Sequence, residues 1–129
     1  MVKTVLFILT LVFTAGMAGP AAAASVVALM SADVDAYREA LRGFKETLRH
    51  RVVAEYDMQG DFDRGQKILS EIQTKIKPDL IFAIGVWALQ ATASQKLNLP
   101  VVYAMVLNPP SVVRDEVHNI TGASMNVPV

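Results

Sequence analysis

The chain has 129 residues, of which 53% are hydrophobic and 19% are charged, with 12 basic side chains, 12 acidic side chains and no cysteine. This composition indicates one globular domain with a real core, and it excludes a fibrous or disordered protein. Zero net charge without a basic stripe argues against a nucleic-acid partner, and the lack of cysteine excludes a disulfide framework and a thiolate nucleophile.

The N-terminus has the three parts of a secretory signal peptide. A lysine precedes the apolar run from Val5 to Phe13, which is shorter than the ~20 residues that a membrane-spanning helix needs. The small-residue tract Ala21 to Ala24 then offers a cleavage site before Ser25. We therefore expect residues 1–24 to be a cleaved signal peptide and the protein to be periplasmic.

After the signal peptide, short β-branched runs alternate with longer segments of helical spacing, as in repeated βα units. Val26 to Met30 is a continuous apolar run, as expected of a strand covered on both faces. A helix is predicted from Val34 to about Arg49. The apolar side chains on its sheet-facing side are Tyr37, Leu41, Phe44 and Leu48.

The next two βα units follow the same pattern. A strand from Arg51 to Asp57 precedes a helix that Asp61 or Asp63 can cap and that extends to Ile76. The buried stripe of this helix is predicted to comprise Phe62, Ile68, Leu69, Ile72 and Ile76. The remaining predicted elements are a strand from Asp79 to Ile84, a helix from Val86 to Leu97, and strands from Val101 to Val106 and from Ile120 to Met125.

This order of elements predicts an α/β fold with a doubly wound, mostly parallel sheet flanked by helices on both faces, because crossover connections are right-handed. In such sheets ligands bind beyond the carboxyl ends of the strands, where the strand order reverses. The loops after the strands are therefore the places to search for a site.

The chain lacks the residues that several common α/β active sites and phosphate-binding loops require. No GxGxxG or GxxxxGK[ST] motif follows the first strand, and no GxSxG elbow is present. His50 and His118 have no partner at metal-ligand spacing, so we interpret both as solvated surface side chains. We accordingly expect no catalytic residues, no metal site and no cofactor, and we do not expect an enzyme.

The ends of two predicted strands are suited to binding a ligand without catalysing a reaction. Ser31 and Gly85 each stand next to a helix N-terminus, where free backbone N–H groups favour a carboxylate or another anion. Ser31 could instead be a simple helix cap. Trp87, the only tryptophan, could be a ligand platform, but core packing is the more common role of such a residue.

The segment KPDLIFAIGVWALQATASQKLNLPVVYAMVLNPPSVV, followed by NITGASM, resembles the solute-binding proteins of ABC transporters with the type I periplasmic-binding fold. The most similar branch is linked to the uptake of aromatic amino acids and related small solutes, and the resemblance covers Ser25 to Val129. In that family two α/β lobes close over a solute. The resemblance therefore implies a small-molecule solute, possibly an aromatic or other amino acid, and an ABC transporter permease as partner.

Carried over by position, the resemblance also implies the ligand-binding residues. They follow the first, third and fourth strands: Ser31, Asp33, Gly85, Val86, Met105, Val106 and Asn108. The chain departs from the family's pattern at Asn108, where relatives often have Asp, and at Val86, where a small hydroxyl residue is frequent.

The length matches one lobe rather than two. We therefore interpret residues 25–118 as the N-terminal lobe and residues 119–129 as a crossover strand or hinge towards an absent second lobe, with Gly122 permitting a bend. The alternative is a periplasmic module without solute binding, in which the face left uncovered by the missing lobe pairs two copies. The sequence Asn119-Ile120-Thr121 matches a glycosylation acceptor, but so short a motif arises by chance.

Overall fold

The computed structural model describes residues 23–48, 51–113 and 118–126. The predicted signal peptide up to residue 22 and His50 thus lie outside the described residues. None of the helices in the described ranges is long and apolar enough to span a membrane.

Five strands form one sheet in the order β2-β1-β3-β4-β5, and every neighbouring pair is parallel. The strands are β1 (Ser25–Met30), β2 (Arg51–Asp57), β3 (Leu80–Ile84), β4 (Val101–Val106) and β5 (Ile120–Ser124). The bounds of β2 and β4 are those predicted from the sequence, and the parallel arrangement is confirmed.

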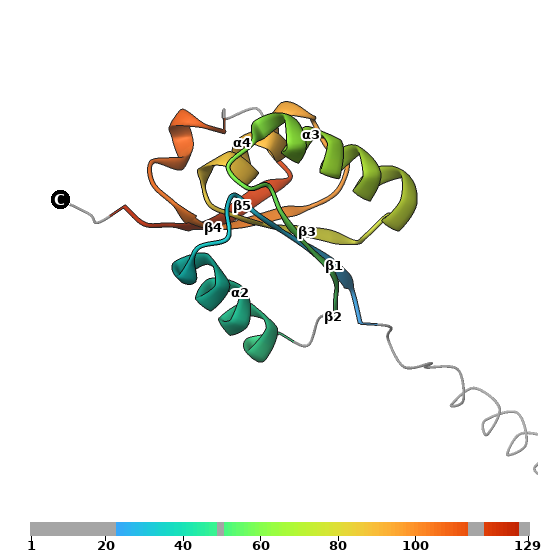
Figure 1. Cartoon of the computed structure of the whole chain (residues 1–129), viewed down its shortest axis with the longest axis horizontal. Coiled ribbons are helices and arrows are strands. Elements are labelled where there is room, and N and C mark those ends of the chain that lie inside the picture. The colour runs from blue at the N-terminus through green and yellow to red at the C-terminus, as the bar shows by residue number, and fades with distance from the viewer. Residues whose placement is uncertain (1–22, 49–50, 114–117, 127–129) are drawn as a thin grey trace, which may run out of the picture.

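The helices lie on both faces of the sheet, with α2 (Asp35–Thr47) on one side and α3 (Phe62–Glu71) and α4 (Val86–Ser94) on the other (Figure 1). A π-helical turn, η1 (Ile72–Ile76), prolongs α3, and a short 3₁₀ turn, η2 (Pro109–Ser111), follows β4. This arrangement is the doubly wound α/β fold expected from the sequence. The helix after β3 is shorter than predicted, because it ends at Ser94 rather than Leu97.

Each face of the sheet has its own core, since successive side chains of a strand point to opposite faces. On the side of α3 and α4, the predicted stripe is buried at Ile68, Leu69 and Ile72 and partly buried at Phe62 and Ile76. On the other side, α2 contributes Leu41, Tyr37 and Phe44. The prediction for Leu48 is wrong: α2 ends one residue earlier, and Leu48 is 38% exposed.

The last strand, β5, pairs with β4 at the edge of the sheet. The Asn119 side-chain amide anchors its start by donating to the backbone carbonyls of Leu97 and Leu99, at 2.7 and 2.8 Å. Gly122, expected to permit a bend, lies within the strand and packs directly on the backbone of Tyr103, so that a Cβ at this position would clash. Close strand approach is therefore the physical requirement for glycine here.

Candidate binding site at the carboxyl edge of the sheet

The reversal of strand order falls between β1 and β3. From β1 the chain runs to β2 through α2 on one face, and from β3 it runs to β4 through α4 on the opposite face (Figure 1). The loops that follow β1 and β3 therefore diverge at their shared carboxyl edge, which is where ligands bind in open α/β sheets. These loops contain four of the predicted site residues: Ser31, Asp33, Gly85 and Val86.

Ser31 joins the two loops through its side chain. It is only 2% exposed, and its Oγ donates to the carbonyl of Ile84 and accepts from the amide of Ala88, both at 2.9 Å. The hydroxyl thus caps α4, the helix after the neighbouring strand β3. It does not cap α2, the helix that follows Ser31 in the chain. With its proton and one lone pair used internally, Ser31 acts here as a positioning residue.

Gly85 lies at the centre of this edge and leaves no room for a side chain. Its φ of 90° and ψ of 167° belong to a region that is essentially restricted to glycine. A Cβ at this position would lie 2.6 Å from Ser31 Oγ and 2.7 Å from the hydroxyl oxygen of Tyr37. Both hydroxyl side chains therefore meet the backbone at this glycine.

The N-terminus of α4 begins next to Gly85. The first amides of an α-helix have no partner within the helix, and Ser31 satisfies only that of Ala88. Within the described ranges, no acceptor is found for the amides of Val86 and Trp87. They add two donors and a partial positive charge to this edge, which favours an acceptor atom such as a carboxylate oxygen.

Trp87 is 48% exposed, so the expectation that it packs in the core is wrong. Its ring lies next to that of Phe62, the first residue of α3, with centroids 6.4 Å apart and planes inclined by 57°. The pair places aromatic surface at the starts of the two helices on this face. Apolar rings beside a few polar donors are typical of small-molecule sites.

Asp33 is exposed and its carboxylate is paired with a cation. It forms an ion pair with Arg38, which also binds Asp35. The pKa of the Arg38 guanidinium is raised from its usual value, mainly by the hydrogen bond to Asp33, so Arg38 stays a cation. Asp33 therefore borders the site as part of a three-residue ion cluster, in which two carboxylates share one guanidinium.

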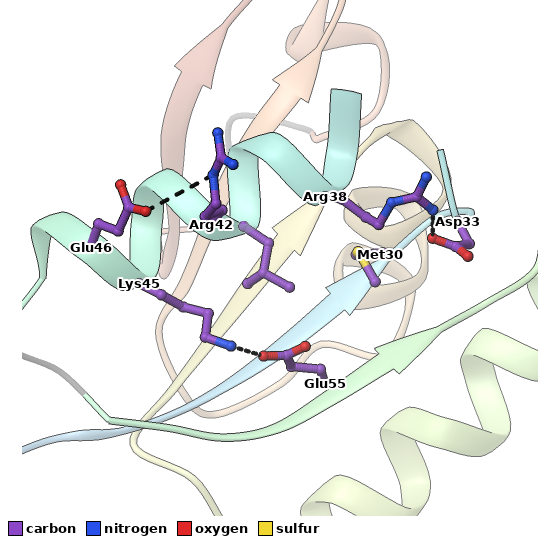
Figure 2. A pocket seen from close by; sticks show the side chains of 8 residues that line it. Met30, Asp33, Arg38, Arg42, Lys45, Glu46 and Glu55 are labelled. Atoms are coloured by element: carbon purple, nitrogen blue, oxygen red, sulfur yellow. Dashed lines mark hydrogen bonds and ion pairs between the residues drawn. The ribbon is translucent and has the colours of Figure 1, made fainter. Parts of the chain in front are cut away.

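A hollow of about 460 Å³ extends from Asp33 along α2 and the adjacent strands, with Met30 and Leu41 among its lining residues (Figure 2). Its charged groups are paired with one another: Arg42 lies beside Glu46, and Lys45 beside Glu55 on β2 (Figure 2). The hollow runs along the flank of α2, and Gly85 is not among its lining residues. The backbone amides without an acceptor among the described residues lie instead at the carboxyl edge.

The end of β4 has unusual backbone geometry. Met105 adopts a φ of 60° at an irregularity in the pairing with β5, and Asn108 has a φ of 47°. The amide of Asn108 donates to the side chain of Asn126 at 2.8 Å, and Val106 is fully buried, so its side chain packs rather than faces a ligand. Non-glycine residues in the left-handed region cluster at functional sites.

Sequence reasoning missed Tyr37 and Phe62 as site residues. It assigned both to buried helix stripes, and both are indeed partly buried. Each lies in the first turn of its helix, and first turns lie at the carboxyl edge in βα units; that position was the available signal. In the described residues no group of three histidine or acidic side chains could hold a metal ion.

No protein-family model matches the chain, and no curated protein sequence matches it. The chain is similar to several solved structures, including the following two. The first is an ABC domain from Streptococcus pneumonia in complex with L-Trp, which is 22% identical with a TM-score of 0.64 over 80% of this chain and 39% of that one. The second is the ligand-free, open structure of a substrate-binding protein with adhesive properties from Clostridium difficile, also 22% identical, with a TM-score of 0.68 over 82% of this chain and 40% of that one.

The chain thus spans about two fifths of the length of each of these structures. At this level of identity the similarity establishes the fold. The chain has the α/β fold of part of a substrate-binding protein, and its structural neighbours are binding proteins.

Proposed function

We propose that this chain is the solute-binding N-terminal lobe of the substrate-binding protein of an ABC import system, and that it is not an enzyme. The single observation that carries the proposal is the carboxyl edge between β1 and β3. There the amides of Val86 and Trp87, for which the described residues supply no acceptor, follow a glycine that admits no side chain. The fold shared with substrate-binding proteins supports the same conclusion.

The proposed ligand is a small solute with a carboxylate, and an amino acid with an aromatic side chain is the first candidate. The amides at the start of α4 would bind the carboxylate, and the exposed ring of Trp87 with the partly buried ring of Phe62 would contact the apolar part of the solute. The L-Trp complex of the streptococcal neighbour supports this class of ligand. Residues Asp33, Met105 and Asn108 border the same edge in the proposal.

The remaining parts of the proposal concern the cellular setting. Residues 1–24 would direct the chain to the periplasm, where an ABC transporter permease would receive the solute. Residues 119–129 would lead towards a second lobe. A lobe on its own supplies about half of the enclosing contacts, so we expect weak, millimolar binding, because sites that bury most of a ligand bind more tightly.

The test is a titration of the isotopically labelled protein with L-Trp, L-Tyr and L-Phe, followed by amide chemical shifts in NMR. We expect saturable shifts confined to the proposed contacts, at residues 31–34, 37, 62, 85–88 and 105–108. The informative variant is Val86→Pro, because proline is tolerated at the first position of a helix, stays apolar and removes the amide donor. This change should weaken binding about 10-fold, the effect of one hydrogen bond to a charged group. Unchanged spectra with all three amino acids would refute the proposal.

A second candidate function is self-association, and the free edge of β5 favours it. Residues Thr121 to Ser124 of this strand are exposed and carry no charge. The opposite edge strand, β2, has a pairing irregularity and exposed charged side chains, which are features that prevent edge-to-edge pairing. Sedimentation equilibrium of the wild type and Thr121→Lys distinguishes the two functions: a dimer that the lysine dissociates would support self-association, and a wild-type monomer would exclude it.

A further inference from the structure

The Tyr37 side chain reaches the carboxyl edge of the sheet from the face opposite to α4. Tyr37 lies in the first turn of α2, and its ring packs partly buried on the core beneath that helix. A Cβ at Gly85 would lie 2.7 Å from its hydroxyl oxygen and 2.8 Å from its Cζ. The hydroxyl end of the ring therefore lies against the glycine at the centre of the proposed site.

The hydroxyl groups of Tyr37 and Ser31 converge on this glycine but differ in their hydrogen bonding. Ser31 is satisfied by one donor and one acceptor from the main chain. Tyr37 Oη makes no hydrogen bond to any residue that the structure describes. Since the same residues contain no fully buried side-chain polar atom without a partner, the Tyr37 hydroxyl is reachable from solvent. A phenol in such a position normally binds a polar partner.

The groups around Gly85 also define what that partner can be. The available polar groups are neutral donors: the phenol on one side and the amides of Val86 and Trp87 on the other. The nearby cation, Arg38, is held by Asp33 and Asp35. A solute carboxylate at the edge beside this buried glycine can therefore accept hydrogen bonds from the phenol with one oxygen and from the amides with the other.

We propose that Tyr37 is a specificity-determining residue, whose hydroxyl donates a hydrogen bond to the carboxylate of a solute bound at the carboxyl edge beside Gly85. This inference rests on the proposed function and deepens it, because it selects solutes with a carboxylate over otherwise identical ones without it. A site that hydrogen-bonds a group discriminates strongly against ligands that lack the group, since donors that such a ligand covers are then left unpaired.

The test uses Tyr37→Phe, which keeps the ring and its packing and removes only the hydroxyl. The matched control is Tyr56→Phe, a partly buried tyrosine on β2 that packs in the core of the opposite face. Wild type and both variants are titrated with L-Trp and with tryptamine, which lacks the carboxylate, and amide shifts are followed by NMR. We expect Tyr37→Phe to weaken L-Trp binding about 10-fold, to leave tryptamine binding unchanged and to leave the melting temperature equal to that of the control.

The outcomes separate the two levels of the proposal. Wild-type L-Trp affinity in Tyr37→Phe would overturn the role of the hydroxyl while the binding function stands. Equal weakening of L-Trp and tryptamine, or a melting temperature below that of Tyr56→Phe, would show a structural role and also overturn it. Failure of the wild type to bind any amino acid tested would instead refute the binding function itself.

Discussion

Replacing Gly85 by alanine tests the geometry of the site most directly. The substitution places a Cβ 2.6 Å from Ser31 Oγ and 2.7 Å from the Tyr37 hydroxyl oxygen, closer than atoms pack without a shift of one of them. A φ of 90° with a ψ of 167° adds backbone strain of about 1–3 kcal/mol for a residue with a Cβ. Overpacking in a well-packed region adds about 1–3 kcal/mol. We therefore expect Gly85→Ala to lower the free energy of unfolding by about 2–6 kcal/mol.

Two other glycines separate these contributions. Gly60 has a φ of 69°, but a Cβ added there would have no atom within 4 Å, so Gly60→Ala carries the backbone strain without the clash. Gly43 lies within α2 with open space around it and no positive φ. Gly43→Ala should stabilise the protein by about 0.5–1 kcal/mol, because alanine loses less conformational entropy in a helix.

The assay is thermal denaturation followed by circular dichroism at constant pH. A loss of about 2 kcal/mol or more corresponds to a fall in Tm of at least about 8 °C for a domain of this size. The predicted order of Tm is Gly43→Ala, wild type, Gly60→Ala and then Gly85→Ala. If Gly85→Ala were no less stable than Gly60→Ala, the contact of Ser31 and Tyr37 with this glycine would be refuted, and the inference about the Tyr37 hydroxyl would lose its geometric basis.

Three further predictions concern polar contacts that hold the sheet and its loops. Ser31→Ala should lower stability by about 1–3 kcal/mol, because a buried carbonyl and a buried helix amide lose their partner. Asn119→Ala should cost about 1–3 kcal/mol, because two carbonyls before β4 lose their donor. Two hydrogen bonds from Ser25 lower the pKa of Asp79. The larger effect comes from the backbone amide of Ser25 and the smaller one from its hydroxyl. The stabilisation by this carboxylate is therefore present above the unfolded pKa of about 3.9 and is lost as the pH falls through the lower folded value. The Tm difference between wild type and Asp79→Asn should thus be constant from about pH 7 to 5 and should close at more acid pH.

Each of these predictions has a control that shares its chemistry. Ser70→Ala removes an exposed hydroxyl that bonds only to its own helix, and it should change stability by less than Ser31→Ala. Asn98→Ala changes an exposed loop amide and should stay within about 0.5 kcal/mol of wild type. Equal effects at Asn119 and Asn98 would contradict the anchoring of β5. A Tm difference at Asp79 that persisted unchanged to about pH 2 would contradict the assignment of its effect to the carboxylate.

The Asn119 contacts also bear on the glycosylation motif. The side-chain nitrogen that would carry a glycan donates to two backbone carbonyls and is partly buried. From the sequence alone we interpret this motif as a chance match. The structure adds a physical reason against glycosylation, because a glycan on that nitrogen would break the hydrogen bonds that hold the start of β5.

The fold could be read from the sequence because its signals are local. Continuous apolar runs such as Val101 to Val106 indicate strands covered on both faces, and the alternation with helical spacing determines a parallel, doubly wound sheet. The loops at the carboxyl edge follow from that topology, so Ser31 and Gly85 could be selected from the order of elements alone. The end of α2 could not be predicted to the residue, because Leu48 has the spacing of the buried face but lies beyond the last turn.

Tertiary structure alone decided what the side chains at that edge do. Ser31 caps a helix that begins 55 positions further along the chain, at Val86, and no local pattern records so distant a partner. Tyr37 meets Gly85, and Trp87 meets Phe62 at the surface, only because parallel strands bring the starts of separate helices to one edge. Sequence periodicity tells which face of a helix is apolar, whereas the contacts at its first turn depend on the neighbouring loops. The sequence therefore determined which edge of the sheet carries the candidate site, and the folded chain decided which of its polar atoms have partners among the described residues.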